Sequence, residues 1–329
     1  MIEKVILVRP RGFCAGVERA IKIVEDCLQI FGKPVYVKHE IVHNKHVVDS
    51  LTKKGAITVN TVEEIPQNAT AVFSAHGSPP QDFEKARQKN IRLIDATCPL
   101  VSKVHLEVHR YANQGYTILY IGHKGHVEAD GVCAELPGKL HLIETIKDIE
   151  EIRMNKEEED DKEKNQNNDN KKGVYLTQTT LSVDETKEII AALKKRFPNI
   201  KEPPSEDICY ATTNRQAAIK ELAKNVDVIF VIGSKNSSNS RRLAETAQKT
   251  GKTAFLIDDV NGIKKEMFKD AKIIGLSAGA SVPEYLVQQA VEYFVNLGAK
   301  KEELNVLNEV MTFKEPLELI KIKREQKGI

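Results

Sequence analysis

The sequence has no apolar run that approaches the roughly 20 residues needed to span a lipid bilayer, so we expect no membrane partner. It also lacks an excess of either charge, because 49 Lys and Arg residues stand against 47 Asp and Glu residues, a net charge of +2. This balance gives no electrostatic basis for a nucleic-acid partner. Cysteine is scarce, with five scattered over 329 residues, which excludes a dense secreted disulfide framework and favours a reducing compartment.

Three segments of the chain repeat one order of strands, helices and polar loops. Short β-branched runs alternate with stretches of helical periodicity, which is the pattern of parallel strands joined by crossover helices. The hydrophobic content of 41% is sufficient for a large core in two or three domains. We therefore predict an α/β fold of three similar units with small parallel sheets, arranged pseudo-threefold around a common centre. The expected units are residues 1–97, 98–208 and 209–329.

Three cysteines lie at matching points of this repeat. Cys14, Cys98 and Cys209 each follow a short apolar run and precede an amphipathic stretch, so each is expected before or at a helix N-terminus, where partial positive charge favours a thiolate. Thiolates are metal ligands, although any single free cysteine is often only a small buried apolar residue. We assign that structural role to the other two, Cys27 and Cys133, which lie within periodic helical stretches.

Three thiolates from distant segments suit an iron–sulfur cluster better than zinc. A zinc site usually shows a close ligand pair such as C-x₂-C, and none of these cysteines has a neighbouring cysteine. Zinc with a bound water remains an alternative. Iron–sulfur clusters normally take four cysteines. With three, one iron has no protein thiolate and can accept and polarise a substrate oxygen, which indicates chemistry rather than electron transfer alone.

The loops expected after the strands are rich in neutral and weakly basic hydrogen-bond donors. Such groups at strand and helix ends suit a phosphate or diphosphate, although each is also an ordinary turn or capping residue. One carboxylate, Glu128, stands in a donor-rich loop two residues after His126 and is a candidate proton source; a plain surface glutamate is the alternative. The candidate donors are His43, His76, His126, Thr179, Thr180, Ser237, Ser238, Asn239 and Ser281.

Seven motifs over nearly the whole chain give it a resemblance to the 4-hydroxy-3-methylbut-2-enyl diphosphate reductases. They are Pro10–Val17, Ser74–Gly77, Asp95–Pro99, Gly122–His123 with Gly125–His126, Thr177–Ser182, Ile208–Arg215 and Gly233–Ser240. The resemblance implies three α/β units around a [4Fe–4S] cluster and the last step of the non-mevalonate isoprenoid pathway. That step removes a hydroxyl reductively and gives isopentenyl and dimethylallyl diphosphate.

The same resemblance implies a role for each candidate residue. Cluster ligation falls to Cys14, Cys98 and Cys209. Proton delivery falls to Glu128, and Thr179 orients the substrate hydroxyl. We further expect the neighbouring His126 to hold Glu128 toward the substrate, and Thr180 to be one of the donors. Diphosphate binding falls to His43, His76, His126, Ser237, Ser238, Asn239 and Ser281.

The reaction implied by the family needs an external one-electron donor such as ferredoxin or flavodoxin, because the sequence shows no flavin or nicotinamide motif. Two alternatives remain at this point. A hydro-lyase of the aconitase type would need the same open iron without a reductant, and a non-catalytic iron–sulfur redox sensor would form no product. Product formation that depends on a reductant separates all three.

Residues 155–172 contain no apolar residue, and we predict a disordered surface insertion there. Its richness in Asn and Lys favours a plastid-derived, apicoplast-like organelle, and the bacterial cytoplasm is the alternative. No transit peptide is expected in this chain, because its first predicted strand, residues 5–8, begins almost at once. No role is assigned to the basic tail, residues 321–327.

Overall fold

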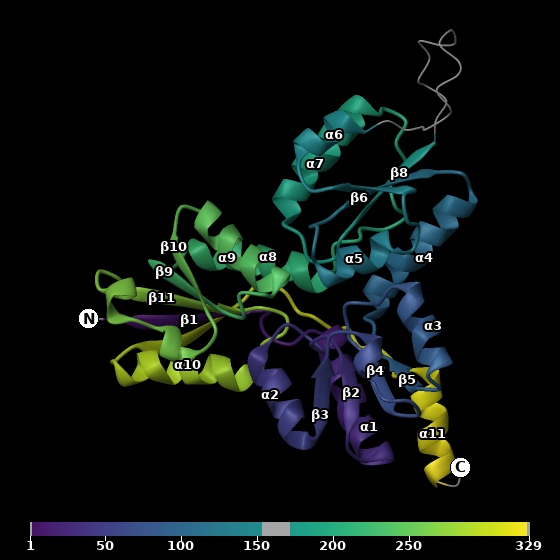
Figure 1. Cartoon of the computed structure of the whole chain (residues 1–329). Helices are drawn as coiled ribbons and strands as arrows, with labels where there is room; N and C mark the ends of the chain where they lie inside the picture. The colour runs from purple at the N-terminus through teal and green to yellow at the C-terminus, as the bar shows by residue number, and fades with distance from the viewer. Residues whose placement is uncertain (1, 153–171, 328–329) are drawn as a thin grey trace. The chain divides into compact units, whose positions relative to one another are not determined.

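The computed structural model describes residues 2–152 and 172–327, drawn in colour in Figure 1. Their contacts divide the chain into two compact units. The first comprises residues 1–77, 81–99 and 210–329, and the second comprises residues 78–80 and 100–209. The expected insertion at 155–172 lies outside the described residues, except for Lys172.

The first unit contains a five-stranded sheet in the order β10-β9-β11-β1-β12, and every pairing in it is parallel. Three helices connect or cover these strands (Figure 1): α8 (Tyr210–Ala223), α9 (Ser238–Lys249) and α10 (Glu284–Asn296). The strands are β1 (Lys4–Arg9), β9 (Val228–Ile232), β10 (Thr253–Ile257), β11 (Ile273–Ala278) and β12 (Lys300–Asn305).

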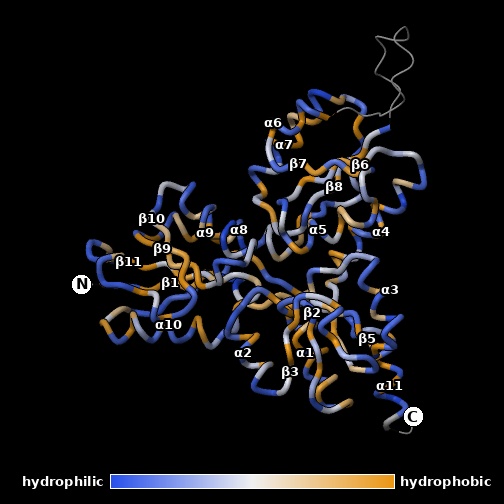
Figure 2. Tube along the Cα trace, in the orientation of Figure 1, coloured by the Kyte–Doolittle hydropathy of each residue, from blue (hydrophilic) through white to orange (hydrophobic). Residues whose placement is uncertain are grey.

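Strand β1 shows why this sheet is buried on both faces. Its residues Val5 and Leu7 pack into a core with α10, whereas Ile6 and Val8 pack into a second core with α8 and α9. Successive side chains of a strand point to opposite faces, so a sheet covered by helices on both sides needs a continuous apolar run. Figure 2 shows the resulting apolar residues along β1, β9 and β11.

The first unit also contains a four-stranded parallel sheet in the order β3-β2-β4-β5. Its helices are α1 (Ala15–Phe31), α2 (Lys45–Lys54), α3 (Pro80–Gln88) and the C-terminal α11 (Leu317–Lys327). Buried apolar residues of α1 pack on this sheet together with Leu319 of α11. The strands are β2 (Val35–Lys38), β3 (Ala56–Val59), β4 (Thr70–Phe73) and β5 (Arg92–Asp95).

The second unit contains a three-stranded parallel sheet in the order β7-β6-β8. Apolar residues of α4 and α5 cover one face and those of α6 and α7 cover the other. The strands are β6 (Thr117–Ile121), β7 (Leu140–Ile143) and β8 (Gly173–Thr177). The helices are α4 (Pro99–Asn113), α5 (Val127–Cys133), α6 (Ile146–Glu151) and α7 (Val183–Arg196).

The predicted class, α/β with three small parallel sheets, is confirmed. One strand departs from the expected division of the chain. The apolar run at residues 5–8 was assigned to unit 1–97, yet β1 pairs with β11 and β12 at the far end of the chain. Hydrophobic pattern identifies a strand buried on both faces but does not specify its partners, because parallel pairing is made through distant segments.

Strand β12 has no counterpart in the hydrophobic pattern of the sequence. Four of the six residues of β12 are charged, and it forms the edge of its sheet, so it lacks a buried apolar run. Among the described residues, no helix combines the length and the apolar character that crossing a membrane requires.

The basic tail, whose role the sequence leaves open, forms most of α11. Lys323 Nζ lies 2.6 Å from the Asp26 carboxylate of α1 and 2.7 Å from Glu315. Lys22 of α1 contacts the same two carboxylates. The tail is therefore held on α1 by an ion-pair network.

Candidate functional site

Cys14, Cys98 and Cys209 each directly precede a helix, as predicted. The helices α1, α4 and α8 begin at Ala15, Pro99 and Tyr210. In the first unit the Cys14 N–H donates to Ala280 O at 3.1 Å, and the Cys98 N–H donates to Ala75 O at 3.0 Å. Both cysteines are therefore fixed by loops that follow β4 and β11, at the carboxyl ends of parallel strands.

Gly16 brings the Cys14 and Cys98 thiols to one place. A Cβ atom at Gly16 would lie 2.7 Å from Cys98 Sγ and 3.9 Å from Cys14 Sγ. The first distance is a clash, so only glycine lets the first turn of α1 approach the Cys98 sulfur this closely. The Cys14 and Cys98 sulfurs therefore both lie next to Gly16, which has no side chain. This arrangement suits a metal group bound by both sulfurs.

A buried arginine holds the loop before Cys14. The Arg215 guanidinium of α8 is fully buried and donates to Gly12 O at 2.7 Å, to Phe13 O at 3.3 Å and to Ala211 O at 3.0 Å. Its charge is paired with Glu309 at 3.0 Å. Burial raises the pKa of the Cys14 thiol, whereas the Val17 N–H and the Arg215 charge act in the opposite direction.

A second arginine supports the loop before Cys98. Arg19 of α1 donates from one guanidinium nitrogen to Ala96 O at 3.2 Å and to Thr97 O at 3.0 Å. A further nitrogen donates to Lys314 O at 2.7 Å. The helix that begins after Cys14 therefore also positions the chain that leads to Cys98.

Cys209 is the last residue of the second unit, and its N–H donates to Thr179 O at 3.0 Å. The Cys14 and Cys98 thiols are a pair within the first unit. Among residues 2–152 and 172–327, no group of three or more His, Cys, Asp and Glu side chains is arranged to hold a metal ion. A third thiolate ligand from Cys209 stays a prediction. Cys27 is fully buried in the core beneath α1, as expected for a structural cysteine.

Two predicted histidines stack in the first unit. The rings of His43 and His76 have centroids 4.0 Å apart and planes 25° apart. His43 Nδ1 lies 3.2 Å from the Glu40 carboxylate, and His76 Nδ1 lies 3.3 Å from Ser74 Oγ. Glu40 also accepts from Asn236 Nδ2 at 2.8 Å. The Glu40 carboxylate therefore orients the His43 ring beside His76.

Ser281 and Asn239 connect to these histidines through the loop after β11. The Ser281 hydroxyl donates to His43 O at 3.0 Å. The Asn239 amide accepts from the Ala280 N–H at 2.8 Å and donates to Thr212 Oγ1 at 3.1 Å. The structure thus brings His43, His76, Asn239 and Ser281 together in the first unit, but the amide of Asn239 already has partners at both ends.

The first turn of α9 carries Ser238 and Asn239, with Ser237 as the N-cap. The Ser237 hydroxyl accepts from the Ser240 N–H at 3.3 Å, so this side chain caps the N-terminus of α9. A Cβ at Gly279 would lie 2.1 Å from Ser240 Oγ. A glycine at 279 therefore lets the Ser281 loop pack against the helix N-terminus.

In the second unit, Glu128 is held by Thr179. Its two carboxylate oxygens accept from the Thr179 N–H at 2.7 Å and from the Thr179 hydroxyl at 2.9 Å. Glu128 is 2% exposed and lies in the first turn of α5, after β6, whereas Thr179 follows the neighbouring strand β8. The alternative of a surface glutamate is wrong.

Burial raises the pKa of Glu128 to about 7, against the two Thr179 hydrogen bonds and the His105 charge, which lower it. A carboxyl group with such a pKa carries a proton for a large part of the time near neutral pH. General acids work best when their pKa lies near the operating pH, so this group is suited to proton donation.

Hydrogen bonds within the loops after β6 and β8 position the donors His126 and Thr180 near Glu128. His126 is the N-cap of α5, and its Nδ1 accepts from the Glu128 N–H at 3.2 Å, which leaves Nε2 as the N–H donor of a neutral ring. Thr180 Oγ1 accepts from Gln178 Nε2 at 3.1 Å. The other end of this amide, Gln178 Oε1, accepts from the His123 N–H at 3.0 Å. The loops after β6 and β8 are therefore tied together by Gln178.

Four residues that shape these sites are absent from the predicted set: Gly16, Glu40, Gln178 and Arg215. Gly16, Gln178 and Arg215 lie within the quoted motifs, and Glu40 lies three residues before His43. The position of Glu40, three residues before His43, could have indicated its role, because an acidic side chain beside a histidine often sets the orientation of the imidazole ring.

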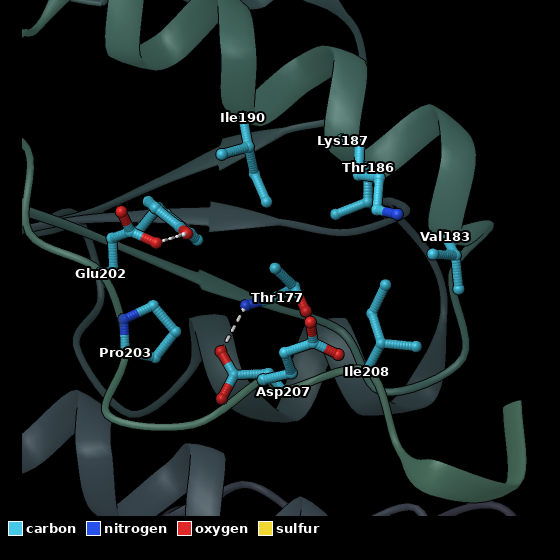
Figure 3. Close-up of a pocket in the computed structure, with 11 residues that line it drawn as sticks. Thr177, Val183, Thr186, Lys187, Ile190, Glu202, Pro203, Asp207 and Ile208 are labelled. Carbon is cyan, nitrogen blue, oxygen red and sulfur yellow. Dashed lines mark hydrogen bonds between the residues drawn. The ribbon is translucent and has the colours of Figure 1, made fainter. Parts of the chain in front are cut away.

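A pocket in the second unit lies between α7 and the chain that follows it (Figure 3). Asp207 accepts there from the Thr177 N–H at 2.9 Å, and Tyr175 donates to Glu202 at 3.0 Å. None of the predicted site residues lines it. The lining residues are Tyr175, Thr177, Val183, Thr186, Lys187, Ile190, Glu202, Pro203, Glu206, Asp207 and Ile208.

Comparison with known proteins agrees with the motifs. The family described as LytB protein matches residues 5–295. A 4-hydroxy-3-methylbut-2-enyl diphosphate reductase of Aromatoleum aromaticum is 48% identical over 318 residues, 96% of this chain and 98% of the relative. A protein of the same name from Escherichia coli O1:K1 / APEC is 47% identical over 320 residues, 96% of this chain and 97% of the relative.

A solved structure of the E-1-hydroxy-2-methyl-but-2-enyl-4-diphosphate reductase from Plasmodium falciparum is similar with a TM-score of 0.92 and 38% identity. The match covers 99% of this chain and 100% of that one. With this fold and these relatives, the chain is an enzyme of the oxidoreductase class, which excludes a non-catalytic redox sensor. It belongs to the LytB family, the 4-hydroxy-3-methylbut-2-enyl diphosphate reductases.

Proposed function

We propose that the chain removes the hydroxyl of 4-hydroxy-3-methylbut-2-enyl diphosphate reductively and gives isopentenyl and dimethylallyl diphosphate. The main support is one observation, the similarity over nearly the whole chain to relatives that bear this reductase name. The Glu128–Thr179 pair gives further support, because a buried acid held by a hydroxyl is what a proton-requiring dehydroxylation needs.

A [4Fe–4S] cluster fits the residues present, because the Cys14 and Cys98 sulfurs both lie next to Gly16, where no side chain fills the space. These two thiolates would hold the cluster together with Cys209, which immediately precedes α8. Such a cluster supplies electrons one at a time and, with an iron free of protein thiolate, a Lewis acid. Arg215 would serve this group by fixing the loop before Cys14, and Arg19 by fixing the loop before Cys98.

The diphosphate would be bound by donors from both units. In the first unit these are His43, His76, Ser281 and the α9 N-terminus with Ser237, Ser238 and Asn239. The helix end attracts negative charge, and the imidazole rings can donate hydrogen bonds to it. In the second unit His126 presents Nε2–H when Nδ1 accepts from the Glu128 N–H.

Glu128 would deliver the proton that completes the reaction. The Thr179 hydroxyl donates to the Glu128 carboxylate at 2.9 Å. Once the carboxyl is protonated this bond would reverse: Glu128 would donate to Thr179 Oγ1, and the Thr179 hydroxyl would donate to the substrate oxygen, orient it and move a proton toward it. Thr180 is held beside it by Gln178. Burial keeps water away from the acid, which preserves its proton until the substrate is bound.

We propose ferredoxin or flavodoxin as the electron donor. The compartment stays a prediction, because the names of the relatives contain no compartment: a plastid-derived organelle is expected from the sequence between 155 and 172, with the bacterial cytoplasm as the alternative.

The test is anaerobic turnover with chemically reduced ferredoxin, with products identified by mass spectrometry. We expect both diphosphate products, and none without reductant. Product formation without reductant would indicate a hydro-lyase instead. The substrate's alcohol, which has no diphosphate, should bind much more weakly, because each buried donor left without its anion costs about 1–3 kcal/mol.

The ligand assignment is tested by replacing each of the five cysteines with serine. We expect loss of bound iron for Cys14, Cys98 and Cys209, and normal iron for Cys27 and Cys133. Equal loss of iron in Cys27→Ser would contradict the assignment.

A further inference from the structure

Lys103 of α4 reaches the chain that leads to Cys209 in the second unit. Its ammonium donates to Ser205 O at 3.0 Å, to Glu206 O at 3.4 Å and to Asp207 Oδ1 at 2.9 Å. An ammonium group has three N–H donors and no acceptor, so these contacts use all three. The Lys103 side chain is 26% exposed, whereas that of Asp207 is 0% exposed. The lysine therefore places its charge against a buried carboxylate.

The other oxygen of this carboxylate binds the end of β8. Asp207 Oδ2 accepts from the Thr177 N–H at 2.9 Å. Two residues further along each segment, the Cys209 N–H donates to Thr179 O at 3.0 Å. The segment before Cys209 is therefore bound to the loop after β8 at two points. Thr179 is also the residue whose N–H and hydroxyl hold Glu128, so the position of Asp207 affects both the cysteine and the buried acid.

Two other contacts are weaker than the one between Lys103 and Asp207. Glu107, one turn further along α4, lies 3.7 Å from the Lys103 ammonium, against 2.9 Å for Asp207. Lys194 of α7 contacts the segment at Glu202, in a pair whose side chains are 45% and 57% exposed. Exposed ion pairs contribute little, whereas a buried carboxylate that loses its partner is costly. The position of the segment therefore depends more on Lys103 than on Lys194.

We propose that Lys103 is a positioning residue that, through Asp207, sets the places of Cys209 and Thr179 in the candidate site. The proposal rests on the proposed roles of these two residues in cluster binding and in orienting the substrate. Lys103 acts on the chain before the thiol, by fixing residues 205–207. Without its ammonium, two carbonyls and one oxygen of a buried carboxylate lose this donor, so we expect the chain near Cys209 to open more often.

The test compares Lys103→Met with Lys194→Met as the matched control. Methionine keeps an apolar stem but has no charge and no donor. In cluster-free protein, amide hydrogen exchange resolved to single residues reports how often each backbone hydrogen bond opens. We expect the Thr177 and Cys209 N–H groups to exchange about 10–100-fold faster in Lys103→Met, because loss of a hydrogen bond to a charged group shifts an opening equilibrium by about that factor. Lys194→Met should exchange at the parent rates.

The same protein contains an internal control for a general loss of stability. The Cys14 and Cys98 N–H groups are hydrogen-bonded in the first unit, and they should exchange at the parent rates in Lys103→Met. Iron per chain after anaerobic reconstitution should fall in this variant. In the fraction that binds iron, kcat should fall while KM changes little, because Thr179 is proposed to orient the hydroxyl and a misplaced positioning group slows the chemical step.

Asp207→Asn tests the same link if Lys103→Met does not fold. The amide keeps an acceptor for the Thr177 N–H but removes the charge that Lys103 contacts, so exchange at Cys209 should again increase selectively. Parent exchange at Cys209 in either folded variant would overturn the proposal. An equal increase at the two cysteines of the first unit would overturn it as well, because the effect would then be general.

Cys209→Ser, measured in parallel, separates failure of this proposal from failure of the proposed function. Loss of iron in Cys209→Ser, with normal iron and parent exchange in Lys103→Met, would overturn the positioning role and leave the ligand assignment standing. Normal iron in Cys209→Ser would contradict the ligand assignment. The exchange rates, measured without a cluster, would still decide whether Lys103 positions this chain.

Discussion

Glu128 is the residue whose chemistry depends most on its surroundings. The same side chain on the surface would be ionised near neutrality, whereas its burial beneath Thr179 raises its pKa to about 7. The acid form must be present for proton donation. We therefore expect kcat to fall as the pH rises through about 7, because the folded protein then holds Glu128 as a carboxylate.

Glu128→Gln tests this pH dependence. The amide keeps the shape of the side chain and can still interact with Thr179, but it has no acidic proton. We expect turnover about 10²–10⁴-fold slower, with normal cluster spectra and substrate binding, and without the decline around neutrality. If this variant turned over at the parent rate, the proton would have to come from the substrate's own diphosphate or from water.

Gly16 is the residue on which the two thiols depend for space. In Gly16→Ala the new methyl group would lie 2.7 Å from the unshifted Cys98 sulfur. Overpacking of this kind costs about 1–3 kcal/mol of stability, and we expect the displaced thiol to lose most of the bound iron. The measurements are iron per chain after anaerobic reconstitution and thermal unfolding of the cluster-free protein.

Glu18→Ala is the matched control, because Glu18 is an exposed residue of the same helical turn. Normal iron content in Gly16→Ala would show that the thiols tolerate a side chain between them.

The site residues divide according to how much the sequence could reveal. Glu128 and His126 are identified by residue type and spacing, because an acid among donors is unusual. Arg215 is different: an arginine in an amphipathic helix ordinarily faces solvent, and its burial follows only from the carbonyls of Gly12 and Phe13, about 200 residues away in the chain. Such long-range contacts leave no local pattern.

The loop from Pro10 to Cys14 depends on helix α8 for its shape. Arg215 donates to two carbonyls of this loop and is paired with Glu309. In Glu309→Gln the buried guanidinium loses its counter-charge but keeps its carbonyl acceptors. We expect the free energy of unfolding to fall by about 1–3 kcal/mol, measured by urea titration of the cluster-free protein.

The control is the Lys272–Glu3 pair, whose side chains are 71% and 56% exposed. Glu3→Gln should lower the free energy of unfolding by less than about 1 kcal/mol, because exposed ion pairs contribute little. Equal effects of the two variants would show that the buried pair has no special role.

Elements were predictable where their sequence is apolar throughout. Strands β6 and β9 are of this kind, because both faces of each are buried and the apolar run is nearly continuous. Strand β12 has the opposite character. Only Leu304 is apolar among its six residues, and its place at the sheet edge follows from pairing with β1.

At the scale of the whole chain, the stretch from 155 to 172 is the clearest departure from an ordinary α/β sequence. It has no apolar residue, and the sequence therefore predicts no contribution to a core. We expect a variant in which a short Gly-Ser linker replaces it to keep its iron content and its turnover. A large loss of turnover in a folded variant with normal iron would show that these residues take part in function.

The sheet that contains β1 could not be assembled from the sequence alone. Its strands come from both ends of the chain, and β1 lies between β11 and β12. Local periodicity identifies each of the apolar strands, but the choice of neighbour depends on which surfaces remain open after the rest has packed. The order of strands in this sheet therefore follows from the packing of the whole molecule and not from the sequence of any single segment.

This placement of β1 has a consequence for the order of events during synthesis. The first strand leaves the ribosome early, yet its partner β12 ends only at Asn305, and Cys14 is fixed by a hydrogen bond to Ala280. Arg215 likewise acquires its counter-charge only when Glu309 has been added. The nascent chain therefore holds Cys14 in an unfinished loop until the segments with Ala280, Asn305 and Glu309 have been made, and a cluster bound through Cys14, as proposed above, would be completed only after they have folded.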